Sequence, residues 1–400
     1  MKLPKLVVAL AERLAELGGT TYLAGGPVRD HHLGRVPKDF DLEVHGVEEE
    51  RLAQTLTEFG RVNAVGRSFG VYKLSVEGLE LDVALPRRDS KVGPGHRGIQ
   101  VAGDPWMGPK EACRRRDLTI NAMLYGVLSH ETVDPYGGLK DLKARVLRHV
   151  DPQTFVEDPL RALRVVQFAA RLEFDVAPEL KQLCREAAIA ELPSERILIE
   201  LDKLLLQARR PGAGIRLLEE LDIRSRLFPG LSLDGVDHVV DRAAAQEAHR
   251  PLRDALMLAA MLHRTADPEA VLERLNVHTR ARWPLRRRVL EALAAERVQT
   301  DTELRCLADV LPVELPIRLW WAIDPGWRPD ALAWAGRVGV RDGPLPRLVG
   351  GEQLKELGIP LGPSIGVHMA AVREAQTAGE VCTTEEALLL VKQRLVSRQS

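Results

Sequence analysis

Two aspartates separated by one residue follow a glycine turn near the start of the chain. The turn is Leu23-Ala-Gly-Gly-Pro-Val-Arg-Asp30, and the aspartates are Asp39 and Asp41 of Lys38-Asp-Phe-Asp-Leu-Glu-Val44. In an extended strand the side chains at i and i+2 lie on one face, so these carboxylates can bind the same divalent ions. Mg²⁺ prefers carboxylate, water and phosphate oxygens, and a pair of such ions can hold both oxygens of a phosphoryl transfer. The spacing predicts a magnesium site at Asp39 and Asp41.

The glycine turn predicts a phosphate-binding element. Gly25 and Gly26 let backbone amides approach a triphosphate closely, and Arg29 can clamp it. Either feature alone is usually a plain turn or a solvated strand end. In this order they resemble the motif of nucleotidyltransferases related to DNA polymerase β, in the version found in class II tRNA nucleotidyltransferases and bacterial poly(A) polymerases.

Length and composition limit the number of domains and the way in which the chain can bind nucleic acid. A chain of 400 residues suggests two to four domains, and a net charge of −1 requires any nucleic acid to be met by local basic patches. The cysteines are too far apart for a zinc ribbon or a disulfide framework and are predicted to be packing residues in a reducing cytoplasm: Cys113, Cys184, Cys306 and Cys382. No segment reaches the roughly 18 apolar residues of a membrane span, and no signal peptide precedes the first helix. We therefore predict a cytoplasmic protein.

The first 150 residues predict a small mixed sheet with helices. Helical spacing of leucines indicates a helix over residues 5–17, and alternating apolar residues indicate strands at 71–76 and 79–85. Asp82 lies on the second of these strands, on the opposite face from its apolar neighbours. It is either an exposed strand residue or a third carboxylate, able to accept the attacking hydroxyl's proton or to complete a metal shell.

Residues 86–109 are rich in glycine, proline and basic residues and predict a loop without regular structure. Such a loop is either a lid or binding loop or plain surface disorder. In the family that the motifs resemble, a flexible loop in this position is needed for the terminal A, and enzymes that add only CC lack it. The resemblance therefore argues against a CC-only enzyme.

Arg114-Arg-Arg-Asp-Leu-Thr-Ile-Asn-Ala-Met123 predicts a helix with a basic first turn. A charge run is usually a solvated face, but cations near a helix N-terminus are unfavourable unless an anion is present. The segment is similar to the family's Arg-Arg-Asp-x-x-x-Asn motif, which implies contacts with the ribose and phosphates of a nucleotide for Arg115, Arg116, Asp117 and Asn121. Residues 134–138, Asp-Pro-Tyr-Gly-Gly, match a family turn that implies a hinge.

From about residue 150 helices dominate, and Asp158, Arg161 and Arg164 are spaced three apart, which places them on one helical face. They are either an internal ion-pair ladder or a base-reading set. Cytosine and adenine both present an amino donor beside a ring-nitrogen acceptor, so one Asp/Arg pair can accept CTP and ATP and reject UTP and GTP. The set resembles the family's Glu-Asp-x-x-Arg amino-acid template. Gln167 stands where some members carry a further arginine.

The second half carries weaker signals. His263 is followed by Arg264 and not by Asp, so the metal-ligand pair of a His-Asp phosphohydrolase is absent and an apolar helix is expected. Residues 280–288 form a basic patch that is either an RNA contact or a solvated helix. Trp320 and Trp321 are predicted to be core residues. Residues 350–366 resemble the family's tail, where a helix entry meets the tRNA backbone.

Taken together, the resemblance implies an α+β fold: a polymerase-β-type nucleotidyltransferase head at 1–150, then all-α neck, body and tail domains at 151–215, 216–325 and 326–400. It implies CCA addition to tRNA 3′ ends from CTP and ATP with Mg²⁺, and neither DNA nor a membrane as a partner. An enzyme that adds only the final A, or a poly(A) polymerase, shares the motifs. A non-catalytic RNA-binding protein is expected to lack the metal carboxylates, which this chain keeps.

Overall fold

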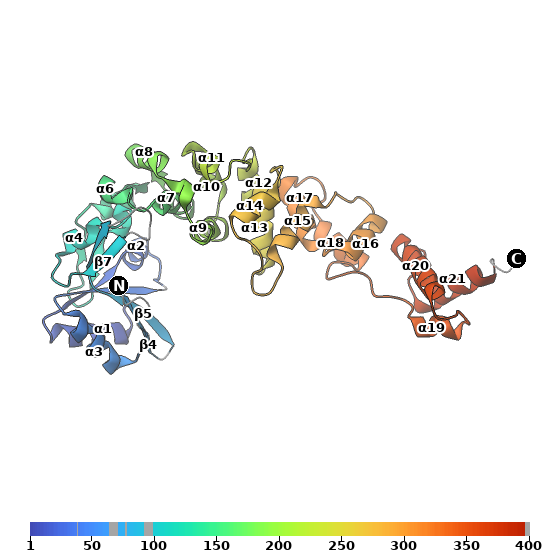
Figure 1. The fold of residues 1–400 in the computed structure, drawn as a ribbon, viewed down its shortest axis with the longest axis horizontal. Helices are drawn as coiled ribbons and strands as arrows, with labels where there is room; N and C mark the ends of the chain where they lie inside the picture. The colour runs from blue at the N-terminus through green and yellow to red at the C-terminus, as the bar shows by residue number, and fades with distance from the viewer. Residues whose placement is uncertain (38, 64–70, 77, 92–98, 397–400) are drawn as a thin grey trace. The chain divides into compact units, whose positions relative to one another are not determined.

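The computed structural model describes residues 1–37, 39–63, 71–76, 78–91 and 99–396 (Figure 1). By its internal contacts the chain divides into two compact units, Met1–Pro229 and Gly230–Ser400, and each is described by itself. The four domains expected from the sequence are a finer division, which stays a prediction.

The first unit begins with a seven-stranded mixed sheet in the order β3-β4-β5-β2-β1-β8-β9. Its strands are β1 (Thr20–Ala24), β2 (Phe40–His45), β3 (Arg61–Asn63), β4 (Val71–Val76), β5 (Leu79–Ala84), β8 (Leu124–Gly126) and β9 (Thr132–Val133). Strand β2 is parallel to β5, and its other neighbour β1 is antiparallel to it. The parallel register sets Asp41 opposite Asp82. The predicted mixed sheet is confirmed, and it brings two of the expected carboxylates onto neighbouring strands.

Helices cover this sheet and begin at the positions that the sequence pattern indicates. Helix α1 (Lys5–Ala15) contacts α3 (Glu49–Phe59), and Figure 1 shows both at the blue end of the chain. The apolar residues of α1 are buried at i, i+3, i+4 and i+7, the spacing of a core-facing helix: Val7, Leu10, Ala11 and Leu14. The short helix α2 (Gly26–His32) opens at the glycine turn.

The prediction that residues 86–109 form no regular element is wrong over two short stretches. Strands β6 (Arg87–Lys91) and β7 (Ile99–Gly103) pair antiparallel, with Arg87 opposite Gly103. The polar sequence of β6 carries no apolar alternation, so it gives no strand signal by itself, and its pairing with β7 supplies the structure. Residues 92–98, the centre of the predicted loop, lie outside the described residues.

The prediction of a helix with a basic first turn at residues 114–123 is also wrong. Helix α4 (Pro109–Arg114) ends where that helix was expected to begin, and the 3₁₀ turn η3 (Thr119–Asn121) follows it. The arginines therefore lie at a helix C-terminus, where a positive charge is favoured by the helix dipole. The helix dipole therefore gives no reason to expect an anion near these arginines, and any anion must be inferred from the contacts of their side chains.

Helices continue the first unit beyond the sheet. They are α5 (Gly138–Ala144), α6 (Pro152–Phe155), α7 (Leu160–Leu172), α8 (Pro178–Glu186), η4 (Ile189–Glu191), α9 (Ser194–Gln207), α10 (Gly212–Glu220) and α11 (Ile223–Leu227). A two-stranded parallel ladder of β10 (Val146–Leu147) and β11 (Asp175–Val176) lies among them. Helix α7 packs against α9 and α10 and is buried along most of its length, so its polar residues have fixed positions.

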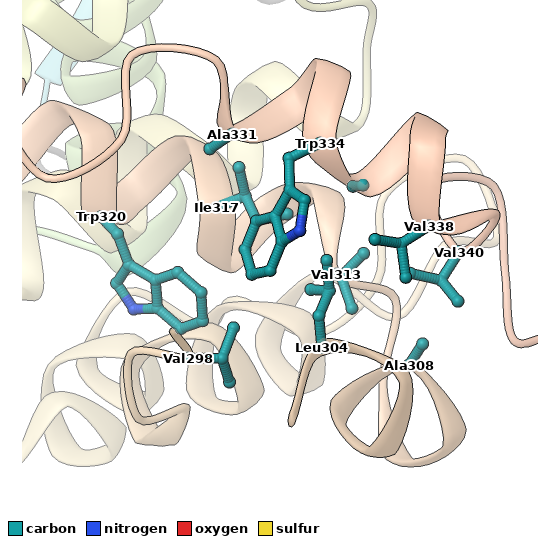
Figure 2. Close-up of a cluster of buried hydrophobic side chains, with 11 residues drawn as sticks. Val298, Leu304, Ala308, Val313, Ile317, Trp320, Ala331, Trp334, Val338 and Val340 are labelled. Carbon is teal, nitrogen blue, oxygen red and sulfur yellow. The ribbon is translucent and has the colours of Figure 1, made fainter. Parts of the chain in front are cut away.

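The second unit is helical in the part that the structure describes, apart from a single bridge between Arg280 and Trp283. Its helices are α12 (Val236–Ala244), α13 (Leu252–Leu262), α14 (Pro268–Arg274), α15 (Leu285–Ala294), α16 (Asp301–Val310), α17 (Glu314–Ile323), α18 (Ala331–Val338), α19 (Gly351–Glu356), α20 (Pro363–Ala378) and α21 (Thr384–Val396). Figure 2 shows Trp320 and Trp334 within one hydrophobic cluster of α16, α17 and α18. Trp320 is core as predicted, whereas Trp321 is half-buried.

The four cysteines are free thiols, but they do not share one environment. Cys113 and Cys184 are buried, and burial raises the pKa of the Cys113 thiol to about 11. Cys306 and Cys382 are exposed, so the prediction that all four are packing residues is wrong for these two. Among the described residues, each helix is too short or too polar to serve as a membrane span.

Candidate active site

A cleft of about 480 Å³ in the first unit collects most of the predicted site residues. Eleven of them line it: Gly25, Gly26, Arg29, Asp41, Arg115, Arg116, Asp117, Asn121, Asp158, Arg161 and Arg164. Asp39 and Asp82 do not line the cleft, although each is close enough to Asp41 to act on its charge. The cleft therefore joins the strand that bears the carboxylates with the helix expected to read a base.

Asp41 and Asp82 are register partners on the parallel strands β2 and β5, so their side chains lie side by side on one face of the sheet. Although Asp41 keeps an exposed side chain, its pKa is raised, first because surrounding protein removes part of its hydration and then because Asp82 and Asp39 repel its charge. Asp82 lies 3.4 Å from the ammonium of Lys73, measured from Oδ1 to Nζ. The negative charges gathered here are only partly offset by Arg116 and Lys73, so the position favours an added cation.

The glycine turn fits closely against the arginines that follow α4. Gly25 has φ of 72°, a conformation that favours glycine, and a Cβ there would lie 2.8 Å from Nη1 of Arg116, so a larger residue would also displace that guanidinium. Arg29, on α2, donates from Nη1 to Oδ1 of Asn121 at 2.7 Å and from Nε to Oδ1 of Asp30 at 2.9 Å. The turn, α2 and η3 therefore form one connected wall of the cleft.

Asp117 holds this wall of the cleft in place through three hydrogen bonds. Its carboxylate accepts hydrogen bonds from the backbone N–H of Leu118 at 2.8 Å, from Nδ2 of Asn121 at 3.1 Å and from Nε of Arg164 at 2.7 Å. Burial by itself raises the pKa of Asp117, but Arg164 and Asn121 outweigh burial and the pKa is lowered. Asp117 is thus a buried, charged residue that connects the η3 turn to α7.

Sequence reasoning missed Glu43, two residues beyond Asp41 on the same face of β2. Its buried carboxylate accepts from Nη2 of Arg116 at 3.1 Å, and Nε2 of His45 lies 3.0 Å from its other oxygen. Burial alone raises the pKa of Glu43, but His45, Arg116 and Arg115 reverse this and lower it to about 2. The alternation of polar residues at 39, 41, 43 and 45 was the signal that could have found it.

The base-reading set is arranged differently from the predicted ladder. Asp158 precedes α7 and accepts from the N–H of Leu160 at 3.2 Å and from Nη2 of Arg196 at 2.8 Å. Arg161 donates to the backbone carbonyls of Thr154 and Arg115, both at 2.6 Å. These contacts therefore do not form an ion-pair ladder among Asp158, Arg161 and Arg164. Each carboxylate oxygen of Asp158 keeps a further acceptor site.

Four residues line the cleft without having been predicted as site residues: Leu160, Phe168, Arg171 and Arg196. Arg196 lies on α9, and its bond to Asp158 connects that helix to the start of α7. Arg171 is one turn beyond Gln167 and at the last turn of α7. Arg161 and Arg171 are ten residues apart, so a short motif does not include both and does not show that they share a face of α7.

Comparison with known proteins agrees with this arrangement. Residues 21–148 match the Poly A polymerase head domain family, and residues 173–234 match a family described as the probable RNA and SrmB-binding site of polymerase A. The Multifunctional CCA protein of Paracidovorax citrulli is 37% identical over 319 residues, which cover 73% of this chain and 72% of that protein. The chain belongs to the class II CCA-adding enzyme and poly(A) polymerase family.

Other relatives of this CCA-adding family add detail on coverage and fold. The Multifunctional CCA protein of Stenotrophomonas maltophilia is 43% identical over 218 residues, or 52% of this chain and 51% of that protein. The chain thus spans about half the length of the first of its curated relatives. The CCA-adding enzyme of Thermotoga maritima complexed with tRNA superposes with a TM-score of 0.73 at 23% identity, covering 98% and 95% of the two chains. That likeness shows the predicted fold class of the CCA-adding family.

Membership of the CCA-adding family implies a divalent metal ion, and the residues present fit one. Among the described residues, no three His, Cys, Asp or Glu side chains gather closely enough to hold a metal by themselves. Magnesium does not need such a cage, because it is commonly held by one or two carboxylates together with water and substrate phosphates. Burial first, and then repulsion from Asp82 and Asp39, raises the pKa of Asp41, and a divalent cation would relieve that repulsion.

The basic patch at residues 280–288, for which the sequence leaves either an RNA contact or a solvated helix open, makes ion pairs within its own unit. Arg280 pairs with Asp254 at 2.8 Å, and Arg287 and Arg288 each pair with Glu291 at 2.7 Å. These ion pairs favour the reading of a solvated basic helix for most of the patch. The apolar helix expected before His263 is present as α13.

Proposed function

We propose that this protein adds CCA to the 3′ end of tRNA, using CTP and ATP and releasing pyrophosphate. One observation carries the proposal: a single cleft holds Asp41, the glycine turn and the Asp158/Arg161 pair. A nucleotide whose base lies at Asp158 and Arg161 has its phosphates within the same cavity as Asp41. The relatives named as CCA proteins support the reaction class, and the Thermotoga maritima enzyme complexed with tRNA supports the partner.

In this proposal Asp39 and Asp41 hold Mg²⁺, which when bound supplies positive charge to the reacting phosphate. The 3′-hydroxyl of the RNA attacks the α-phosphate, the bond to the β-phosphate breaks, and the hydroxyl proton passes to a base. Asp82 is our candidate for that base, since it is the neighbour of Asp41 on the paired strand and its charge acts on Asp41. Its ion pair with Lys73 leaves an acceptor oxygen available.

Base selection follows from hydrogen-bond direction. The carboxylate of Asp158 accepts from the exocyclic amine of cytosine or adenine, and the guanidinium of Arg161 donates to the neighbouring ring nitrogen. Uracil and guanine present a carbonyl and an N–H in those places, so each base would leave one acceptor facing Asp158 and one donor facing Arg161. Arg196 orients the carboxylate of Asp158 through its 2.8 Å bond.

The deciding experiment incubates the full chain and Mg²⁺ with tRNA lacking CCA, and separately with tRNA ending in CC, together with each labelled nucleotide in turn. Addition of C and then A to the first substrate supports the proposal. Growth only of the CC-ended tRNA, and only with ATP, would assign the protein to the A-adding enzymes. Extension of unrelated RNAs by many A residues would indicate a poly(A) polymerase.

Replacement of Asp41 by asparagine tests whether the carboxylate site performs the chemistry. We expect Asp41→Asn to reduce addition by about 10³-fold or more, because an amide cannot replace a charged metal ligand in phosphoryl transfer. Glu80→Gln is a matched control, since Glu80 is an exposed acidic residue on β5 that does not line the cleft. Full activity of Asp41→Asn would contradict the proposal.

A further inference from the structure

Three guanidinium groups surround one phenyl ring at the far end of the cleft. The distances from guanidinium carbon to the Phe168 ring centroid are 5.1 Å for Arg29, 5.3 Å for Arg164 and 5.8 Å for Arg171. Phe168 and all three arginines line the cleft. Cation–π attraction helps to hold each arginine, but it does not remove the repulsion among them.

Two of these three cations form ion pairs with nearby carboxylates, and the third does not, although the charges of Asp30 and Glu200 partly offset its own. Arg164 pairs with Asp117 at 2.7 Å, and Arg29 pairs with Asp30 at 2.8 Å. Arg171 donates from Nη1 to the amide oxygen of Gln167 at 2.9 Å, and within the described part of the chain its guanidinium makes no ion pair. Burial, and after it the charge of Arg29, lowers the pKa of Arg171, although a guanidinium stays protonated.

Gln167 is the residue that holds the guanidinium of Arg171 in position. Its side chain is buried at 1% exposure, and its amide oxygen is occupied by Arg171. The Nε2 group of Gln167 has no hydrogen-bond partner, so the residue keeps a buried donor unsatisfied while it holds the guanidinium. Gln167 does not line the cleft, whereas Arg171 does. The glutamine is therefore a support that orients the arginine toward the cavity.

We infer that Arg171, oriented by Gln167, binds a phosphate group of the substrates in this cleft. The inference rests on the proposed function and assigns a residue to the phosphate end of that site. A desolvated cation without an anionic partner is unfavourable, and a phosphate offers it a bidentate, charge-assisted pair of hydrogen bonds. The other α7 arginine beside Phe168, Arg164, already has a carboxylate partner in Asp117.

The position along α7 is consistent with a phosphate and not with a base. Ten residues of helix separate Arg161 from Arg171, which is about 15 Å of rise. Arg161 belongs to the base-reading pair, so Arg171 stands at the opposite end, beside the arginine that follows the glycine turn. Two phosphates share this chemistry: one in the triphosphate of the incoming nucleotide and one in the backbone of the RNA 3′ end.

Binding measurements on the full chain test the inference without relying on catalysis. The probes are inorganic tripolyphosphate, CTP, and a short RNA ending in CC. The matched control is Arg145→Ala, because Arg145 also lies 5.8 Å from a phenyl ring, that of Phe174, but outside the cleft. Arg145→Ala removes the same charge and a similar ring contact, so it should leave all three affinities unchanged.

For Arg171→Ala we expect an affinity loss of about tenfold, the usual effect of one charge-assisted hydrogen bond. A loss for tripolyphosphate and CTP places the nucleotide's triphosphate at Arg171. A loss for the RNA, with a salt-dependence slope reduced by about one, places a backbone phosphate there. Arg171→Lys should recover part of either affinity, because it keeps the charge and loses the planar fork.

Gln167→Met is the test of the orienting role. Methionine has a similar volume but no acceptor, so it should weaken the same probe by about threefold. It should have no further effect when Arg171 is already alanine, which is a coupling that a purely structural defect would not show. Equal affinities of Arg171→Ala and Arg145→Ala for every probe would overturn the inference.

The two proposals fail in different ways. If the wild-type chain bound tripolyphosphate through Arg171 but added no nucleotide to tRNA, the proposed function would be wrong and the phosphate contact would stand. If it added CCA while Arg171→Ala bound every probe as tightly as the control, only the phosphate contact would be wrong.

Discussion

The buried ion pair between Asp117 and Arg164 gives the first unit a measurable dependence on pH. We expect Asp117→Asn to reduce local stability at neutral pH by about 2–3 kcal/mol, because Arg164 and two other donors lose a charged acceptor. This is below the roughly 3–5 kcal/mol for breaking a fully buried pair, since the Arg164 side chain keeps 31% exposure. Hydrogen exchange of the α7 amides measures the change.

The sign of the pH effect follows from the lowered pKa of Asp117. The stabilisation is fully present above the unfolded value of about 3.9 and is lost as the pH falls through the lower, folded value. The difference between wild type and Asp117→Asn should therefore shrink below about pH 4. Asp151→Asn is the control, because its partner Arg114 is exposed and the pair is worth less. A difference that grew in acid would contradict this account.

Asp158 is expected to set the choice of base. Asp158→Ala should lower kcat/KM for CTP and ATP by about 5- to 150-fold relative to UTP and GTP, since a good base-edge contact is worth about 1–3 kcal/mol of discrimination. The measurement is nucleotide addition with each of the four triphosphates. Glu157→Ala removes the adjacent carboxylate, which does not line the cleft, and should change nothing. Unaltered selectivity in Asp158→Ala would remove this residue from base recognition.

At the level of elements, the start of α5 fixes the η3 turn that carries Asn121. Gly138 packs so closely that a Cβ would lie 2.3 Å from the backbone oxygen of Thr119. Because that atom is backbone, Gly138→Ala must displace the turn, and we expect a loss of about 1–3 kcal/mol together with weaker nucleotide binding. Gly108→Ala, before α4, meets nothing within 4 Å and is the control. Urea unfolding and CTP affinity together test the prediction.

The elements also show how far sequence reasoning reaches. Short-range patterns located the glycine turn, the strand of Asp41 and α7, because periodicity and a turn residue are local properties. The strand β6 was missed because its polar sequence carries no apolar alternation, so only its pairing with β7 defines it. The true end of α4 was missed because the basic run at residues 114–116 was assigned to the start of a new helix, whereas α4 ends at Arg114. Glu43 lies in a polar alternation that the sequence does show, but its contacts with Arg115 and Arg116, more than seventy residues away, are not visible in a local pattern.

Across the whole molecule, the residues that line the cleft come from separate stretches of the first unit. They range from Gly25 to Arg196, and none belongs to the unit that begins at Gly230. The wall of β2 and the glycine turn meets α7 through contacts such as Arg29 with Asn121 and Arg164 with Asp117. Nucleotide recognition should therefore be a property of this unit alone.

Separate expression of residues 1–229 tests whether the first unit alone recognises the nucleotide. The fragment contains the whole cleft and forms a compact unit by its internal contacts, so we expect it to bind CTP within about threefold of the full chain. Its tRNA affinity should fall if the second unit supplies phosphate contacts, because each one lost weakens binding and reduces the salt dependence. Calorimetry with CTP and a salt titration with tRNA give the two numbers. A fragment with native circular dichroism but no CTP binding would show that the second unit completes the nucleotide site.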